Sequence, residues 1–95
     1  MKFSEFLRLY RKSNSLTQEN LASSTGFTKA YISHLETEKK TPGMEFIKTF
    51  SQVYNIPAIL FASNELMQAN NEEEKKLKNK IDFLLDDLKS YYLTE

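Results

Sequence analysis

The chain has 95 residues, of which 40% are hydrophobic, with two Gly, two Pro and no Cys. This length provides one compact core, and the lack of Cys excludes a disulfide framework and a cysteine-ligated metal site. The formal net charge is zero, but residues 1–63 hold eight Lys and Arg against five Asp and Glu (+3), and residues 64–95 hold five against eight (−3). This division predicts a different partner for each part. We expect a soluble cytoplasmic protein, because no apolar run approaches the ~18 residues of a membrane span and no signal-peptide pattern opens the chain.

The first residues have the spacing of an amphipathic helix. Phe3, Phe6, Leu7 and Tyr10 lie at i, i+3, i+4 and i+7, and the pattern fades at residues 13–15. This predicts a first helix with one apolar face.

Two short helices are expected next, separated by a break at residues 24–27. Thr17 is placed to cap the first of them, whose apolar face is Leu21 and Ala22. Gly26 provides the left-handed conformation for a sharp turn. Thr28 can cap the following helix.

The polar loop 38–43 leads to a fourth helix, expected over about residues 44–54. Its predicted apolar face consists of Phe46, Ile47, Phe50, Val53 and Tyr54. Asn55 tolerates the left-handed conformation that would end this helix. Pro57 suits the first turn of a short fifth helix carrying Ile59, Leu60 and Phe61.

A polar connector over residues 64–74 separates this first domain, residues 1–63, from an amphipathic helix over residues 75–95. The helix carries a heptad seam, by which we mean Leu77, Ile81, Leu84, Leu88 and Tyr91; Leu85 and Tyr92 widen it on one flank. The seam is compatible with a homodimer, with a helix folded back on its own domain, and with docking of a different protein. Because an isolated helix of this length is marginal in water, we expect self-association to cover it, and the widened flank favours an antiparallel pair or a four-helix arrangement.

Two helices joined by a short turn that contains Gly cross at a wide angle, and the small Ala22 allows their close approach. The inward positions of the second of these helices are Ile32 and Leu35. At 100° per residue the outward positions are Ala30, Ser33, His34 and Thr37, with Lys29 towards the edge. This face is small and polar, as a helix in a DNA major groove must be.

Residues 3–61 resemble the phage-repressor-like (Xre) helix-turn-helix family, which includes the lambda and 434 repressors. The resemblance rests on "LTQENLASSTGFTKAYISHLE", "TP" and "YNIPAILF" in their order and spacing. It implies an all-α, five-helix DNA-binding domain, here followed by a C-terminal oligomerisation helix. The family binds double-stranded DNA.

The resemblance also implies roles for individual residues. The positions that face base edges are Thr28, Lys29, Ala30 and His34, to which the outward face adds Ser33 and Thr37. The phosphate-contact candidates are Thr17 and Gln18 at a helix N-terminus and Lys39, Lys40 and Thr41 in the loop. Arg11 and Glu36 occupy the positions of a structural ion pair between the first and third helices.

The chain departs from the family pattern at two places. Glu38 stands where the family usually has Gly, so we expect the third helix to run on or to end differently. The outward face also lacks Arg and Gln, the usual bidentate base readers.

We therefore predict a sequence-specific transcriptional regulator, a repressor, that binds a near-palindromic operator as a homodimer or higher even oligomer through residues 28–37. The alternative is an antitoxin-like or adaptor module whose C-terminal helix binds another polypeptide; a protein anti-repressor is a further candidate partner there. We expect no enzyme activity, metal or cofactor, because the chain has one His, no Gly-rich phosphate loop and no recognisable catalytic constellation.

Overall fold

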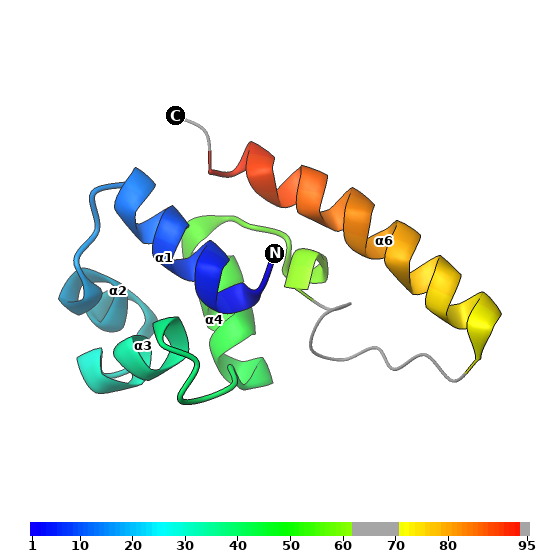
Figure 1. The fold of residues 1–95 in the computed structure, drawn as a ribbon. Coiled ribbons are helices and arrows are strands. Elements are labelled where there is room, and N and C mark those ends of the chain that lie inside the picture. The colour runs from blue at the N-terminus through cyan, green and yellow to red at the C-terminus, as the bar shows by residue number, and fades with distance from the viewer. Residues whose placement is uncertain (62–70, 94–95) are drawn as a thin grey trace.

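The computed structural model describes residues 1–61 and 71–93, which form α-helices and one 3-10 turn and contain no strand (Figure 1). The elements in chain order are α1 (Phe3–Ser13), α2 (Gln18–Thr25), α3 (Lys29–Glu36), α4 (Met44–Tyr54), η1 (Ala58–Phe61) and α6 (Glu72–Tyr91). The all-α, lambda-repressor-like fold is confirmed. No helix in these two ranges is both long and apolar enough to cross a membrane.

Local signals define the ends of α2 and the start of α3. Thr17 and Asn20 form a reciprocal capping box, in which the Thr17 hydroxyl accepts from the Asn20 N–H and the Asn20 side chain accepts from the Thr17 N–H. Gly26 ends α2 in the left-handed region with φ 76°. The Thr28 hydroxyl accepts from the Tyr31 N–H and caps α3. The caps expected at Thr17, Gly26 and Thr28 are confirmed.

Aromatic side chains of α1, α4 and η1 fill the core beside these short helices. The ring of Phe3 lies edge-on to that of Phe61, with centroids 4.9 Å apart, and contacts Phe46 and Phe50 in the same way. Leu21 and Ile32 project from α2 and α3 into this core and are fully buried. Because eight-residue helices are unstable alone, this shared burial holds α2 and α3 in place.

The structure corrects the predicted apolar faces at the end of the domain. Asn55 ends α4 with φ 58°, as expected. The fifth helix is only a 3-10 turn, in which Leu60 and Phe61 are buried but Ile59 is 66% exposed. Val53, expected on the buried face of α4, is also exposed, whereas Ile56 is buried. The turn is too short to bury both of its sides.

The α3–α4 connection begins at Glu38, which adopts φ 62°. α3 therefore ends at Glu36, and Glu38 takes the left-handed conformation in which Gly is usual. The Glu38 carboxylate accepts from the Ser4 hydroxyl at 3.2 Å and lies 3.3 Å from the Lys2 ammonium. These contacts with the start of α1 are exposed and offset only part of the backbone strain.

Replacing Glu38 by Gly should raise the free energy of unfolding relative to Glu38→Ala by about 1 kcal/mol, because both substitutions remove the carboxylate but only Gly relieves the strain. Against the unsubstituted chain the gain should be about 0.5–1 kcal/mol, since exposed ion pairs contribute little. Urea unfolding of the three proteins at one concentration checks this. Equal stability of the Gly and Ala variants would contradict it.

The C-terminal helix α6 lies along α1 and η1 (Figure 1). It begins at Glu72, three residues before its predicted start, with the Asn71 side chain as its cap. Most of the predicted connector, residues 64–70, lies outside the described residues. Leu85, Tyr92 and Leu93 pack against the core.

A buried lysine is part of this docking face. Lys89 is fully buried, with its ammonium 3.3 Å from the Met1 carbonyl oxygen and 3.6 Å from the Asp86 carboxylate. The same ammonium lies 6.0 Å from the centroid of the Phe61 ring. The second Asp86 carboxylate oxygen lies 2.7 Å from the Met1 amino group. A buried ammonium needs such partners, so this contact fixes which side of α6 meets the domain.

The heptad seam remains largely uncovered. Leu77, Leu84 and Leu88 are 58%, 60% and 53% exposed, and Tyr91 is also exposed. Ile81 is half-buried. α6 thus folds back on its own domain through the widened flank and presents the seam to solvent.

Candidate nucleic-acid interface

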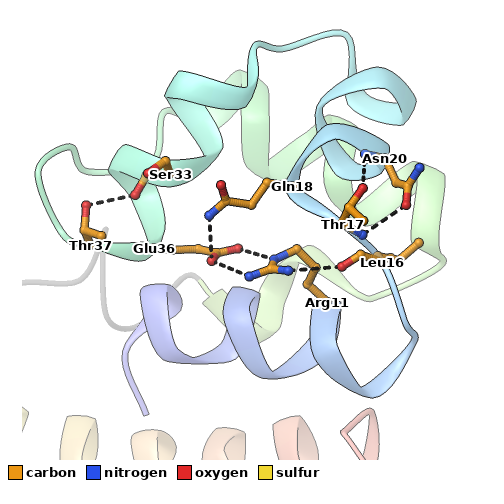
Figure 2. Close-up of polar contacts among 8 residues, drawn as sticks. All are labelled: Arg11, Leu16, Thr17, Gln18, Asn20, Ser33, Glu36 and Thr37. Atoms are coloured by element: carbon orange, nitrogen blue, oxygen red, sulfur yellow. Dashed lines mark hydrogen bonds and ion pairs between the residues drawn. The ribbon is translucent and has the colours of Figure 1, made fainter.

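α3 turns its polar face outward. Ile32 and Leu35 are buried, whereas Thr28, Lys29, Ala30 and Thr37 are exposed and Ser33 and His34 are half-exposed. This face carries no large apolar side chain, and α1 lies between it and α6 (Figures 1 and 2). The outward positions expected from helical geometry are therefore available to a ligand.

Two of the hydroxyl groups on this face also form hydrogen bonds with the backbone of α3. The Thr37 hydroxyl donates to the Ser33 carbonyl oxygen at 2.8 Å (Figure 2), and the Thr28 hydroxyl accepts the capping bond. The Thr28 oxygen can still donate its proton to an acceptor such as a phosphate or a base edge. Both ends of α3 are therefore stabilised by side chains that face the same surface.

Glu19 in the first turn of α2 reaches across to α3. Its carboxylate lies 2.9 Å from the Lys29 ammonium, and both side chains are more than half exposed. An ammonium has three donors, so two remain for base or phosphate acceptors. The sequence does not predict this pair, because residues ten positions apart on two helices meet only through the angle of the turn.

Three side chains join α1, α2 and α3 beneath the outward face (Figure 2). The Arg11 guanidinium donates through Nε and Nη2 to the Glu36 carboxylate at 2.7 and 2.9 Å, and through Nη1 to the Leu16 carbonyl oxygen at 3.1 Å. Arg11 and Glu36 are mostly buried, at 14% and 4% side-chain exposure. The hydrogen bond with Glu36 raises the pKa of the Arg11 guanidinium, against the opposing effect of burial. The two residues for which the resemblance implies an ion pair form a bidentate one.

Gln18 is the third member of this cluster. Its side-chain amide nitrogen donates to Glu36 at 3.2 Å. The amide therefore helps to hold α2 against α3, and the start of α2 is where the unpaired N–H groups of a helix favour an anion. Thr17, the other candidate there, is exposed and uses its hydroxyl oxygen as the cap.

The α3–α4 loop presents the remaining candidates. Lys39, Lys40 and Thr41 are exposed. The Lys40 ammonium lies 5.8 Å from the centroid of the Tyr31 ring, and the Tyr31 hydroxyl accepts from the Gly43 N–H at 3.3 Å. Tyr31 thus contacts the loop at Lys40 and at Gly43, the residue that precedes α4.

The predicted site residues do not include Tyr31. Its ring stacks on that of Phe27, four residues earlier in the chain and just before the cap of α3, with centroids 4.9 Å apart. This i, i+4 aromatic spacing was the available signal. Tyr31 positions the loop rather than facing outward with Ser33 and His34.

The geometry is that of two short helices at a tight turn, with a polar outer face and Lys residues beside it. A family model described as a helix-turn-helix domain matches residues 4–72. No curated protein and no solved structure matches the chain.

Proposed function

Since this chain belongs to the helix-turn-helix domain family, we propose that it is a sequence-specific transcriptional regulator that reads double-stranded DNA through residues 28–37. We further propose that it acts in the cytoplasm as a repressor and binds a near-palindromic operator as a homodimer. The observation that carries the proposal is the outward polar face of α3, framed by its capping Thr28 and by Thr37.

The proposed roles follow the position of each side chain. Lys29 donates to the N7 and O6 acceptors of guanine, and Ala30 offers a methyl contact to thymine. His34 and Ser33 lie one turn further along the same face. The start of α2 and the loop residues Lys39, Lys40 and Thr41 hold phosphates on either side. The proposed division of the chain is a DNA-binding domain over 1–63, a connector over 64–74 and an assembly helix to residue 95.

Fluorescence anisotropy with random duplex DNA across a salt series tests this function. Affinity should fall steeply from 50 to 200 mM salt, since phosphate contacts release counterions. Negligible binding that does not depend on salt would contradict DNA recognition. The exposed seam of α6 would then favour the alternative of an antitoxin-like or adaptor protein.

Replacing Lys29 and His34 together by Ala should erode sequence preference more than general affinity. We expect operator affinity to fall by at least about 30-fold, because two base contacts of about 1–3 kcal/mol each are lost, and random-DNA affinity to fall by less than about tenfold. The operator sequence is identified beforehand by selecting the sequences that the protein binds from a random DNA pool. Lys76→Ala on α6 is the matched control and should change neither affinity. Equal losses on both DNAs would remove the two residues from base reading.

Replacing Glu19 by Gln should strengthen DNA binding. The substitution removes a negative charge beside the proposed groove and releases Lys29 from its 2.9 Å ion pair. Exposed pairs contribute up to about 1 kcal/mol, so affinity for random DNA should rise about fivefold at low salt, and less at high salt. Glu73→Gln in α6 should leave it unchanged. An unchanged or lower affinity would show that the Glu19 carboxylate itself helps to present Lys29.

A further inference from the structure

α6 has two distinct faces. At 100° per residue the seam side chains fall within an arc of about 80°, and the domain-facing Leu85, Lys89 and Tyr92 lie roughly a quarter-turn further round. The second face is occupied by the domain, and the first is exposed at Leu77, Leu84 and Leu88. A solvent-exposed apolar stripe of this length requires a partner.

The charges beside the seam indicate which partner fits. On the flank away from the domain, Lys80 and Asp87 lie seven residues apart, and both are exposed. They occupy the same heptad position two turns apart, and one is positively and the other negatively charged. An antiparallel helix pair brings such equivalent flanking positions together, so each Lys would meet an Asp. A parallel pair in register would place Lys80 beside Leu85 of the partner subunit and so leave Lys80 and Asp87 without a charged partner. It would match only Glu73 with Lys78 of the partner subunit, near the start of α6.

We propose that the seam binds the α6 seam of a second copy of this chain in antiparallel orientation. In the proposed register, the four-residue step from Leu77 to Ile81 lies opposite the four-residue step between Leu84 and Leu88 of the partner subunit. Leu77 then packs on the partner subunit's Leu88, and Ile81 packs on the partner subunit's Leu84. Lys80 then pairs with the partner subunit's Asp87, and the contact occurs twice by symmetry. This inference rests on the homodimer of the proposed function and specifies its geometry.

The position of the domain on α6 favours the same orientation. In an antiparallel pair the two-fold axis is perpendicular to the helices, so both domain-facing sides lie on one side of the pair. Because α1 lies between α6 and α3 in both views, the two α3 helices then point away from the pair in the same general direction (Figures 1 and 2). In a parallel pair the axis runs along the helices, and the domains lie on opposite sides. The antiparallel pair is therefore the one that can present both α3 helices to one duplex, at half-sites about one helical turn apart.

Cysteine crosslinking tests the orientation, because the natural chain contains no Cys. Leu77→Cys and Leu88→Cys are prepared separately and oxidised alone and as an equal mixture. In the proposed register each variant alone should give little covalent dimer, and the mixture should crosslink up to about half of the chains, the share expected for mixed pairs in a symmetric dimer. Phe83→Cys, off the seam, should not crosslink with either. Self-crosslinking of Leu77→Cys would overturn the antiparallel orientation.

A charge exchange tests the register without a crosslink. Lys80→Asp and Asp87→Lys should each raise the dimer dissociation constant about tenfold at low salt, since each creates two like-charge contacts. The double variant should return to within about twofold of the unsubstituted chain, and the differences should shrink at 1 M salt. Unchanged single variants, or a double variant no better than the singles, would overturn the register.

These outcomes separate the two proposals. A monomer in sedimentation, with no crosslink, would overturn both the homodimer and its geometry. A dimer that self-crosslinks through Leu77→Cys would overturn only the antiparallel orientation. The salt dependence of random-DNA binding tests the proposed DNA contacts of α3 and the loop, and its outcome does not depend on how α6 pairs.

Discussion

Replacing Arg11 by Met should lower the free energy of unfolding by about 3–5 kcal/mol, because the substitution leaves the Glu36 carboxylate buried without its charged partner. Glu36 is only 4% exposed, and Gln18 alone would remain to donate to it. Small domains have total stabilities of about 5–15 kcal/mol, so the loss would leave the protein marginal. Urea unfolding at fixed protein concentration measures it.

Two further variants separate burial of a charge from loss of packing. Lys12→Met changes the adjacent, exposed position of α1 and should shift stability by less than about 0.5 kcal/mol. The double variant Arg11→Met with Glu36→Leu should recover most of the lost stability, since it removes the unpaired carboxylate. A loss below about 1 kcal/mol for Arg11→Met alone would show that the pair does not join α1 to α3 energetically.

The functional consequence of this cluster is the placement of α3. Arg11 and Gln18 come from α1 and α2, and both hold Glu36 in the last turn of α3. The carboxylate is thus held from two other helices directly beneath the outward face. We therefore expect the Arg11→Met variant to lose operator affinity even at temperatures where it remains folded.

Replacing Leu84 by Asp should dissociate the proposed dimer, raising its dissociation constant by at least about 100-fold, or about 3 kcal/mol. The carboxylate would enter the middle of the seam in both copies, opposite the apolar Ile81 of the partner subunit. Sedimentation across a concentration series measures the change. Operator affinity should fall with it, because the two linked domains would then bind their half-sites independently.

The neighbouring residue provides the control. Phe83 is 74% exposed, more than Leu84 at 60%, but it points away from the seam. Phe83→Asp removes as much exposed apolar surface and adds the same charge, and it should leave the sedimenting mass unchanged. If both variants, or neither, changed the mass, the seam would not be the dimer interface.

The amino-acid sequence alone determined the all-α class of this fold and the ends of its helices α2 and α4. Thr17, Gly26 and Asn55 define helix ends through hydrogen bonds and backbone conformations that involve only a few neighbouring residues. The outward face of α3 follows from helical periodicity once Ile32 and Leu35 are known to be buried. Such features can be predicted because their causes lie within one or two turns of the chain.

Only the tertiary structure decided the contacts between residues that lie far apart in the chain. The flank of α6 that carries Leu85 and the buried Lys89 lies on the domain and leaves the seam exposed, which the periodicity of one helix could not predict. Glu19 meets Lys29, and Gln18 meets Glu36, only because the turn at Gly26 sets the angle between α2 and α3. Burial and ion pairing are properties of two surfaces in contact, and the pattern along one segment describes only one of them.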